Sequence, residues 1–533
     1  MKVDCIHYKE TNYFSKIVID YLEGAPTLTP FYQYQPEISS FQKAIENKNF
    51  SLEKREVLAH ALAEQYAKGG IHLKESLVAQ NIESLKTKNT FTITTGHQLN
   101  LFTGPLYFIY KIVSVINLSK RLKKLHPEQN FVPVYWMATE DHDFEEISFF
   151  RFKGKTLQWE TQQKGAVGRM NPKELIEVFE EFKTLITPYS TNEQQLKEWF
   201  EKAYLQHDNL ADATRYLVHE MFYEHGLLIV DGDDPVLKTM FIPQVKEELQ
   251  KEISAQLVAQ QNERLAEHYK IQVNPRAINL FYLIDGSRER IIKRKSGFSI
   301  HNTQEKFSTE GFYNLLEKHP ERFSPNVLLR PLYQEVILPN LAYIGGGGEL
   351  AYWFQLKTTF EHFNLPLPVL LLRNSALWLD AKAEKYKEEL KLSTADLFVE
   401  EGVLLKNWVK SNSKIDLTLK DEIKRQQDFF QTLSEKAGRV DATLKPHTLA
   451  MAEKQKQLLE QLSEKLIRSE RLKNTTAADR IAYLKKTFFP KESLQERTDN
   501  FSLLYLVYGK NLIPQLMDNF ELPTKQFVVL SEK

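Results

Sequence analysis

Four ionisable residues stand in a row directly after an apolar stretch of the sequence. The stretch FVPVYWMAT, residues 131 to 139, leads into Glu140, Asp141, His142 and Asp143. Charges at the end of a buried strand cost several kcal/mol each unless they have partners. Glu140, Asp141 and His142 are therefore candidate catalytic residues, which could hold an ammonium group, take a proton from it, or bind Mg²⁺ through oxygen. The alternative is a surface loop whose charges are solvated.

Asp143 has a simpler explanation. Glu146 follows it three residues later, and D-x-x-E is typical of the start of a helix, where the aspartate caps backbone N–H groups. Alternation along a strand would also place Asp143 on the face opposite to Glu140 and His142. We therefore expect Asp143 to cap a helix.

A second group of candidates lies in the segment TGHQLNLFTGP, residues 95 to 105. We expect a loop here, between a short strand FTIT and a helix that opens at Pro105. Free backbone N–H groups and the helix dipole favour an anion such as phosphate at such a point. The segment matches neither common phosphate-binding glycine pattern, so two tight turns beside an ordinary histidine remain the alternative. The residues that we expect to bind a nucleotide are Gly96, His97, Gln98, Thr103, Gly104 and Lys111.

A third group lies in the glycine run IGGGGEL, residues 344 to 350. Four adjacent glycines carry a high cost in chain entropy, which favours a role in ligand binding or close packing. A carboxylate at the start of the following helix is also favourable. The residues that we expect to contact a nucleotide or an amino acid here are Gly345, Gly346, Gly348 and Glu349.

All three groups fall at the ends of predicted strands. Five apolar strands are predicted, within FTIT, FVPVYWMA, GLLIVD, AYI and LPVLLL, with helices between them. A strand, a helix and a strand in succession make the two strands parallel. The segments TGHQ and EDHD should then face one crevice, where open α/β sheets bind ligands. The predicted fold is α/β, with a doubly wound parallel sheet.

The other regions are predicted as follows. Residues 152 to 220 form a mostly helical insert, and FYLIDGSRERIIKRK forms a hairpin that turns at Asp285 and Gly286. Apolar residues with alternating three and four spacing, resuming after Pro446, predict an antiparallel coiled coil over 380 to 488. They are Leu419, Ile423, Phe430, Leu433, Ala437, Val440 and Leu444, then Met451, Leu458, Leu462 and Leu466. The predicted domains are 1–379, 380–488 and 489–533, with the last packing back on the core.

Composition narrows the function classes. Lys plus Arg and Asp plus Glu both number 70 in 533 residues, so no overall charge attracts nucleic acid or anionic lipid. Cys5 is the single cysteine, which excludes an internal disulfide and a thiolate zinc cluster. The sequence shows no secretion signal and no apolar run long enough for a membrane span. We expect a cytoplasmic protein that acts on small molecules, with no nucleic-acid or membrane partner.

Several long motifs together resemble one known family. They are TTGHQLNLFTGPLYFIYKI, VYWMATEDHDFEEI, FSPNVLLRPLYQEVILPNLAYIGGGGELAYWFQLK and LQERTDNF. In order and spacing they are similar to the BshC family, the cysteine ligases of bacillithiol biosynthesis, over nearly the whole chain. The resemblance implies a Rossmann-like nucleotide-binding core with helical inserts, related to class I synthetases, and a coiled coil that mediates homodimerisation.

The resemblance also implies a reaction. An ATP-dependent ligase, using ATP with Mg²⁺, would join the carboxyl of cysteine to the amine of glucosaminyl-malate and form bacillithiol. On this hypothesis the TGHQ loop and Lys111 hold phosphates, Glu140 and Asp141 bind an ammonium, and one of these two or His142 deprotonates the amine. Two alternatives stay open: a nucleotidyltransferase or ligase with another acceptor, and a non-catalytic coiled-coil scaffold that senses a ligand.

Overall fold

The computed structural model, which describes residues 1–187 and 189–532, contains a parallel sheet built from the five predicted strands. The sheet has the order β13-β12-β2-β3-β6, and all neighbouring strands are parallel. Counted within this sheet alone, the first strand, β2, is central, with the second, β3, on one side and the fourth, β12, on the other, as in a Rossmann sheet. The predicted doubly wound fold is confirmed, and its switch point lies between β2 and β12. The strands are β2 (Thr90–His97), β3 (Asn130–Met137), β6 (Leu228–Asp231), β12 (Asn340–Gly345) and β13 (Val369–Leu372).

Strand β2 is longer than the predicted FTIT. Every residue from Thr90 to His97 is buried and in strand conformation, and β-branched threonine and isoleucine suit such a buried strand. Gly96 and His97 therefore belong to the end of a strand and not to a loop. Pro133 is tolerated in the central strand β3 because the pairing with β6 begins only at Val134.

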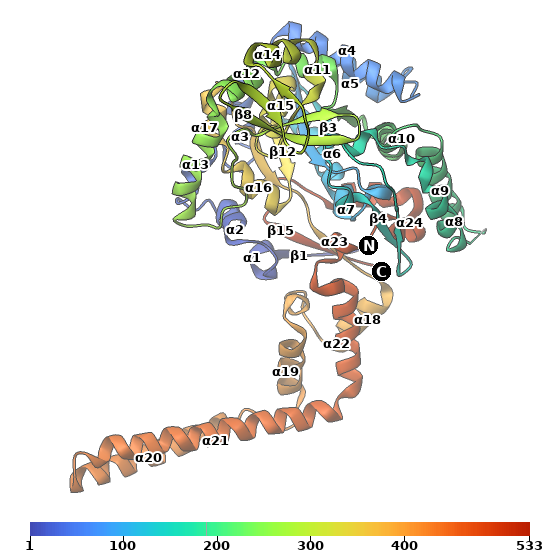
Figure 1. Ribbon diagram of the computed structural model, residues 1–533. Helices are drawn as coiled ribbons and strands as arrows, with labels where there is room; N and C mark the ends of the chain where they lie inside the picture. The colour runs from blue at the N-terminus through green and yellow to red at the C-terminus, as the bar shows by residue number, and fades with distance from the viewer. Residues whose placement is uncertain (188, 533) are drawn as a thin grey trace. The chain divides into compact units, whose positions relative to one another are not determined.

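Helices of the same unit cover this sheet (Figure 1). Helix α6 (Tyr107–Leu125) connects β2 to β3 and packs on both strands; it begins two residues after Pro105, so that proline precedes the helix and does not open it. The single helix predicted after the glycine run is divided into α16 (Gly347–Trp353) and α17 (Lys357–His362). The helices α3 (Ser40–Asn47), α4 (Leu52–Lys68) and α5 (Leu77–Ser84) pack against β12 and β13 or against β6.

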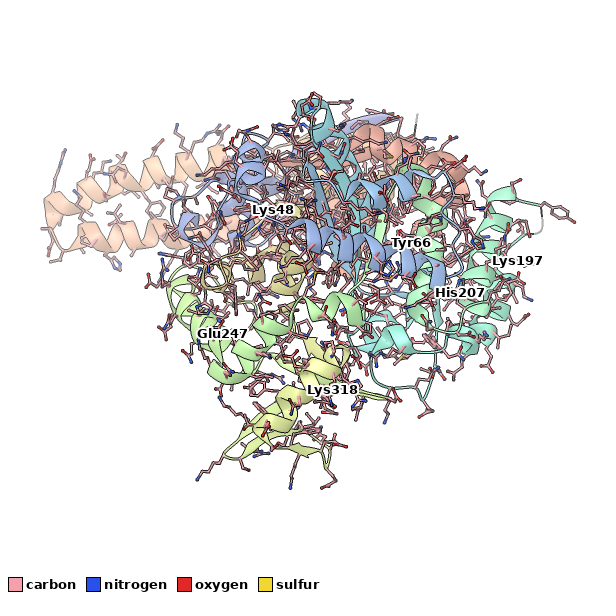
Figure 2. The ribbon with its side chains drawn as sticks, turned by 90° about the horizontal axis from the view of Figure 1, so that it is seen from above. Lys48, Tyr66, Lys197, His207, Glu247 and Lys318 are labelled. Atoms are coloured by element: carbon pink, nitrogen blue, oxygen red, sulfur yellow. The ribbon has the colours of Figure 1, made fainter. Side chains whose placement is uncertain are left out.

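Polar side chains tie these N-terminal helices to the sheet region. Lys48, just after α3, forms a buried ion pair of 2.9 Å with Glu335, and Glu335 accepts a hydrogen bond from the Asn340 amide at the start of β12 (2.6 Å). The Tyr66 hydroxyl on α4 accepts a hydrogen bond from the Ile229 N–H (3.0 Å). Lys48 and Tyr66 are labelled in Figure 2. These contacts satisfy buried polar groups that would otherwise destabilise the fold.

A second, antiparallel sheet lies in the connection between β6 and β12. Its order is β10-β9-β8-β7-β11, and the predicted hairpin is confirmed because Ile284 pairs with Ser287 across Asp285 and Gly286. The sequence did not predict the other three strands. The sheet consists of β7 (Leu280–Ile284), β8 (Ser287–Arg294), β9 (Gly297–Ile300), β10 (Lys306–Phe307) and β11 (Phe323–Pro325).

The remaining elements are mostly helical. The insert between β3 and β6 contains α7 (Phe144–Ile147), the hairpin β4 (Phe149–Phe152) and β5 (Lys155–Gln158), α8 (Ile176–Thr184), α9 (Thr191–Phe200) and α10 (Leu210–Phe222). Others are α2 (Lys16–Glu23), α11 (Pro235–Thr239), α12 (Ile242–Lys251), α13 (Ile253–Ala266), α14 (Thr309–Lys318), α15 (Arg330–Ile337), α23 (Gln495–Thr498), α24 (Phe501–Tyr508) and α25 (Leu512–Asn519). None of the helices in the described part of the chain is long and apolar enough to cross a membrane.

The chain divides into two units. The sheet unit comprises residues 7–376 and 495–528, and the coil unit comprises 1–6, 377–494 and 529 to the end of the described chain. The coil unit holds α18 (Ala381–Glu389), α19 (Glu401–Asn412), α20 (Lys420–Val440), α21 (Leu444–Lys473) and α22 (Thr475–Phe488). The predicted boundaries at 379/380 and 488/489 stay a prediction.

The predicted coiled coil is present, with a shift in its packing face. Helices α20 and α21 run side by side (Figure 1), and the Gln426 amide donates a hydrogen bond to the Ala452 carbonyl across the pair (3.0 Å). The turn falls at 441–443, so Pro446 lies in the first turn of α21, where a missing N–H is tolerated. The stripe predicted on α21 is wrong by one residue: Ser463 and Ile467 are buried, whereas Leu458 and Leu462 are about half exposed.

Candidate functional site

The predicted site lies at the carboxyl edge of the parallel sheet, where β2 and β12 diverge. One ion pair joins the two segments there. The Lys111 ammonium on α6 lies 2.5 Å from Glu349 on α16 and donates to the Gly96 carbonyl at the end of β2 (2.7 Å). Glu349 also accepts hydrogen bonds from the Gly346 N–H (2.8 Å) and the Tyr343 hydroxyl (2.5 Å). This Lys111–Glu349 bridge therefore links the TGHQ segment to the glycine run.

The bridge is largely removed from water. The side chain of Lys111 is 3% exposed and that of Glu349 is 24% exposed. Burial lowers the pKa of Lys111, partly opposed by the charge of Glu349. Burial alone would raise the pKa of Glu349, but the Lys111 charge and the Gly346 N–H hold it below its usual value. Both groups are predicted as nucleotide contacts, and the structure brings them to each other.

Arg330, the first residue of α15, lies over the end of β2. Its guanidinium carbon is 5.8 Å from the Trp136 ring and 5.4 Å from the Tyr343 ring. A Cβ atom at Gly96 would stand 3.1 Å from the Tyr343 hydroxyl and 3.7 Å from Arg330 NH1, so glycine at this position leaves room for both side chains. Nη1 (NH1) donates to Gln334 (3.0 Å), whereas Nη2 (NH2) is buried and has no hydrogen-bond partner among the described residues.

Arg373 follows β13 directly and is held by the C-terminal part of the sheet unit. NH2 donates to Glu496 in an ion pair of 2.6 Å, and NH1 donates to the Ser375 hydroxyl (3.0 Å). The guanidinium lies 4.8 Å from the Tyr107 ring. Its Nε lies near Gly346, 3.9 Å from where a Cβ would be. Arg373 is thus mainly a neutralised, structural cation.

The end of β3 carries a cluster around Asp141. Asp141 accepts hydrogen bonds from the Gln98 amide (2.6 Å) and from Arg288 NH1 (3.2 Å), which comes from β8. Burial would raise the pKa of Asp141, but hydrogen bonds from His142 and the Arg288 charge hold it well below its usual range. His142 Nδ1 lies 3.4 Å from Asp141 Oδ1 and 3.2 Å from Arg288 NH1. Gln98, Asp141 and His142 are therefore brought together as predicted.

Glu140 does not join this cluster. It forms a buried ion pair with Lys238 of α11, whose ammonium also donates to the Phe323 carbonyl (2.8 Å). A carboxylate with a buried cationic partner is not free to accept a proton from a substrate. The prediction that Glu140 contacts a ligand finds no support in these contacts.

The aspartates at the end of β6 are also engaged. Asp233 pairs with Arg169 (2.7 Å), and Asp231 accepts the Thr139 hydroxyl. Asp234 caps α11 by accepting the Val236 N–H (2.8 Å). Asp143 stands at the N-cap position of α7 but makes no side-chain cap hydrogen bond, so the predicted capping by Asp143 is wrong. The short α7, one turn long, is not held by that side chain.

His97, Thr103 and Gly104 are buried. The His97 ring packs between Tyr107 and Phe108, with centroids 5.3 and 5.0 Å away. Burial, with the charges of Lys111 and Arg373, lowers the pKa of His97 well below its ordinary value, so the ring is neutral. It can exchange a hydrogen bond with a ligand but cannot supply a positive charge to a phosphate.

Residues 102 to 104 form a strained turn. Phe102, Thr103 and Gly104 all have φ between +49° and +66°, which non-glycine residues rarely adopt. The Asn500 amide donates to the carbonyls of Phe102 (2.8 Å) and Gly104 (2.7 Å). A Cβ at Gly104 would stand 2.4 Å from the Asn100 Cβ. Thr103 and Gly104 therefore serve the shape of this turn.

The glycines of the run 345–348 differ in their surroundings. A Cβ at Gly345 would lie 3.0 Å from the Glu349 Cβ, so close packing explains this glycine. Gly346 provides the N–H for Glu349, and Gly348 is exposed, with Gln272 Nε2 4.0 Å from where its Cβ would be. Of the predicted glycine contacts, Gly346 and Gly348 remain open to a ligand.

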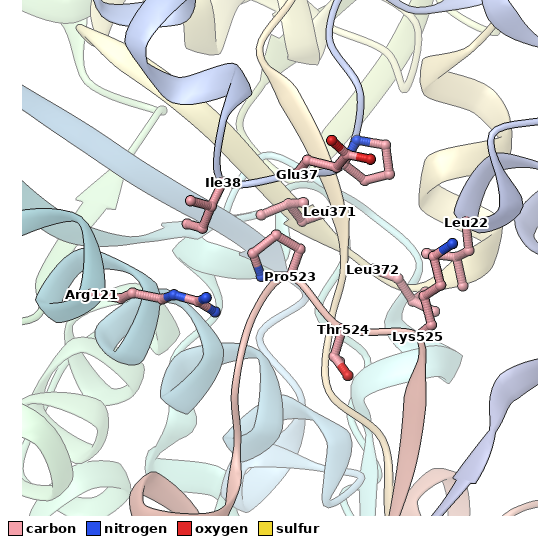
Figure 3. A pocket seen from close by; sticks show the side chains of 10 residues that line it. Leu22, Glu37, Ile38, Arg121, Leu371, Leu372, Pro523, Thr524 and Lys525 are labelled. Atoms are coloured by element: carbon pink, nitrogen blue, oxygen red, sulfur yellow. The ribbon is translucent and has the colours of Figure 1, made fainter. Parts of the chain in front are cut away.

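Neither a metal-binding cluster nor the pocket beside β13 adds a residue to this site. Among residues 1–187 and 189–532, no three His, Cys, Asp or Glu side chains are grouped as a metal site would require. A pocket of about 280 Å³ lies beside the edge strand β13 and is lined by Leu371, Leu372, Arg121, Pro523 and Lys525 among others (Figure 3). Its lining includes none of the candidate residues.

Comparison with known proteins identifies the family. A family model described as "Bacillithiol biosynthesis BshC, N-terminal Rossmann-like domain" matches residues 1–374. A second, described as the BshC C-terminal coiled-coil domain, matches residues 376–532. The chain belongs to the BshC family.

BshC relatives align over their whole length. The chain is 46% identical to a protein of Flavobacterium psychrophilum over 97% of both chains. It is 47% identical to one of Flavobacterium johnsoniae over 98% of both. It is 45% identical to one of Christiangramia forsetii, over 100% of this chain and 99% of the relative. All three are named "Putative cysteine ligase BshC".

Sequence reasoning missed three arginines of the BshC site. Arg330 and Arg373 lie in apolar segments, VLLRPLYQE and LPVLLLR, and a charge inside such a segment could have marked them, because buried arginines need partners or ligands. Arg288 follows the hairpin turn in a run of alternating charges. That run looks like any exposed strand, and only the fold brings Arg288 to Asp141.

Proposed function

We propose that this BshC protein is an ATP-dependent ligase that joins the carboxyl of cysteine to the amine of glucosaminyl-malate, forming bacillithiol. The relatives' name, cysteine ligase, supports the reaction class. The switch point between β2 and β12 is the position at which open α/β sheets bind ligands, and this supports the proposed location of the active site. ATP would supply the activation of the carboxyl, with Mg²⁺ as its counterion.

Two unsatisfied groups at this edge fit a polar ligand that carries hydrogen-bond donors, such as the amino and hydroxyl groups of a nucleotide. His97 Nε2 and Gln98 Oε1 are buried polar atoms without a partner among the described residues, and such atoms are normally satisfied. In the glycine run, Gly348 is exposed, whereas the N–H of the half-buried Gly346 is donated to Glu349. Because Lys111 and Glu349 hold each other, we assign them to the support of both segments and not to contact with phosphate.

Asp141 suits the recognition of an ammonium group. Its pKa lies far below neutrality, so it stays charged and is a poor proton acceptor at neutral pH. His142 is the better base, since its side chain is 47% exposed beside Asp141. In the tautomer in which Nδ1 donates to Asp141, Nε2 is free to take a proton from the attacking amine.

The observation that carries this proposal is the Gln98–Asp141–His142 cluster at the switch point of a chain that is BshC-like throughout. The test is purified protein with ATP, Mg²⁺, cysteine and glucosaminyl-malate, with bacillithiol detected by mass. AMP as the second product would indicate an adenylate, and ADP an acyl phosphate.

Two variants test the assignment. Asp141→Asn should reduce turnover about 100-fold or more, since it removes both the ammonium partner and the support of His142. Asp143→Asn, the neighbouring exposed carboxylate, should retain activity. Wild-type turnover in Asp141→Asn would contradict the assignment. Absence of product with wild-type protein would favour a ligand-sensing scaffold or another acceptor.

A further inference from the structure

Three cations meet at the switch point, and their partners differ. Lys111 is neutralised by Glu349 at 2.5 Å, and Arg373 by Glu496 at 2.6 Å. Arg330 has no carboxylate within ion-pair distance in the part of the chain that the structure describes. Its polar neighbours are neutral: the Gln334 amide oxygen, which accepts a hydrogen bond (3.0 Å), and the Tyr352 hydroxyl. The charge of Glu349 acts on Arg330 from beyond ion-pair distance. A buried guanidinium whose nearest carboxylate makes no contact with it can gain further stabilisation from a ligand oxyanion.

The surroundings of Arg330 hold it in place without satisfying it. Two aromatic rings, Trp136 and Tyr343, lie within 6 Å of its guanidinium and stabilise its charge. Gly96 beneath it carries no side chain that could fill the space. NH2 therefore remains a buried donor with no partner among the described residues.

The position of Arg330 in the fold, at the carboxyl edge of the parallel sheet, also favours ligand binding. It lies over the last residues of β2, the strand at which the sheet order reverses, and this is the edge where such sheets bind ligands. A guanidinium presents paired donors that match the oxygen atoms of phosphate and carboxylate groups. The unsatisfied donor and the position at the switch point are separate observations that both indicate an anionic ligand.

We infer that Arg330 forms an oxyanion subsite that binds a phosphate or carboxylate group of a substrate through NH2. This inference deepens the proposed function. It rests on the proposed function only for the identity of the substrate that carries the phosphate or carboxylate group. The binding itself rests on the contacts of Arg330.

Direct binding measured by calorimetry tests the subsite without a need for turnover. The probes are ATP, inorganic pyrophosphate and L-malate, each added alone to the full-length protein. Arg330→Gln should weaken the probe that occupies the subsite by about 10-fold or more, and Arg330→Lys by less, because lysine keeps the charge but loses the paired donors. If the Arg330 variant binds ATP and pyrophosphate more weakly, the group that occupies the subsite is a phosphate. If only malate binds more weakly, the group is a carboxylate.

The matched control is Arg264→Gln. Arg264 also lies over an aromatic ring, 5.5 Å from Phe31, but on α13 and exposed, and its loss should leave every probe unchanged. Thermal unfolding of each variant shows whether it is folded. If Arg330→Gln does not fold, Arg330→Lys alone decides between weaker and unchanged binding.

Unchanged binding of all three probes to a folded Arg330 variant would overturn the subsite, and so would the absence of any binding to the wild-type protein. The proposed function fails in a different way. If wild-type protein binds a probe through Arg330 but forms no bacillithiol, the subsite stands and the reaction is wrong.

Discussion

Lys111 and Glu349 neutralise each other beside the crevice in which each was predicted to contact a nucleotide. Removing one member of a buried ion pair leaves an isolated charge, and this is usually worse than losing both. Because the Glu349 side chain is 24% exposed, water can relieve part of that penalty. The bridge should therefore be a stability determinant of moderate size.

Lys111→Met should lower the free energy of unfolding by about 2 kcal/mol. The double variant Lys111→Met with Glu349→Gln should recover part of this loss, because it leaves no unpaired carboxylate. The measurement is urea unfolding at pH 7. The control is Lys202→Met, whose exposed pair with Glu198 should contribute little. A double variant no more stable than the single one would show that the pair is not coupled.

Asp231 at the end of β6 predicts a pH dependence. Burial, with the charge of Asp233, raises its pKa from 3.8 to about 6. The folded state therefore binds a proton more tightly than the unfolded state, and the contribution to stability is full below about pH 4 and lost as the pH rises through 6. Asp231→Asn should stabilise the protein by about 1 to 2 kcal/mol at pH 7.

The measurement for Asp231→Asn is chemical unfolding at pH 4.5, 6 and 7.5. The stabilisation relative to wild type should shrink as the pH falls. Asn can still accept the Asp233 N–H that Asp231 Oδ1 accepts (2.8 Å), so hydrogen bonding is preserved. An effect of the same size at all three pH values would contradict a raised pKa.

The sequence could place Gln98, Asp141 and His142 at one edge because strand order and parallel pairing depend on local patterns. It could not separate Glu140 from Asp141, because the partner that removes Glu140 is Lys238, nearly a hundred positions away. Contacts between distant segments decide which partner each carboxylate has, Lys238 for Glu140 and Arg288 with Gln98 for Asp141, and no spacing within the segment records them.

At the level of elements, the strained turn at 102–104 depends on a late segment of the chain. Asn500 donates to two of its carbonyls, and the Leu106 N–H donates to the Asp499 carbonyl (2.7 Å). Three consecutive positive φ angles persist only where surrounding contacts hold them. The motif LQERTDNF therefore shapes the entry to α6.

Asn500→Asp should loosen this turn. The new carboxylate can still accept the Ser502 N–H that caps α24 (3.0 Å), but it replaces two donated hydrogen bonds by repulsion from two carbonyls. We expect a loss of about 2 kcal/mol and faster amide exchange at residues 101 to 106, measured by mass spectrometry.

Asn171→Asp is the control for Asn500→Asp. Asn171 also caps a helical turn, by accepting the Lys173 N–H (3.0 Å), and is exposed. Its substitution should change neither stability nor exchange. Exchange in Asn500→Asp like that of wild type would show that the turn holds itself.

The long elements followed from sequence pattern and the short ones did not. All five parallel strands were predicted because buried strands read as continuous apolar runs. Strands β10 and β11 are two and three residues long, too short for a pattern. The four residues of β9, GFSI, lack the continuous apolar run of the equally short β6 and β13. The face of α21 was misplaced by one residue because apolar residues occupy neighbouring positions along that helix.

At the level of the whole molecule, the coil unit has a stripe of apolar side chains that is exposed to solvent. Met451, Leu458 and Leu462 are between 46% and 55% exposed on α21, beside the face that packs on α20. Apolar residues aligned along a helix favour association with another surface. Dimerisation through this unit stays a prediction, with this stripe as its proposed contact.

The double variant Leu458→Glu with Leu462→Glu should shift the full-length protein from dimer to monomer in sedimentation velocity, because two buried carboxylates would oppose the contact. Lys454→Glu, a charge change on the same helix, should leave the oligomeric state unchanged. A wild-type monomer would refute the dimer, and a dimeric double variant would exclude this stripe as its contact.

The large sequence separation between Asn500 and Phe102, which are in contact, has a consequence for the synthesis of this protein on the ribosome. The two residues are 398 positions apart, so nearly the whole polypeptide leaves the ribosome before the turn at 102–104 gains its anchor. Glu496, the counter-charge of Arg373, emerges equally late. A chain that stops before residue 495 carries the candidate residues of the crevice without these two anchors. Interrupted translation would therefore leave this edge of the sheet without the Asn500 and Glu496 contacts.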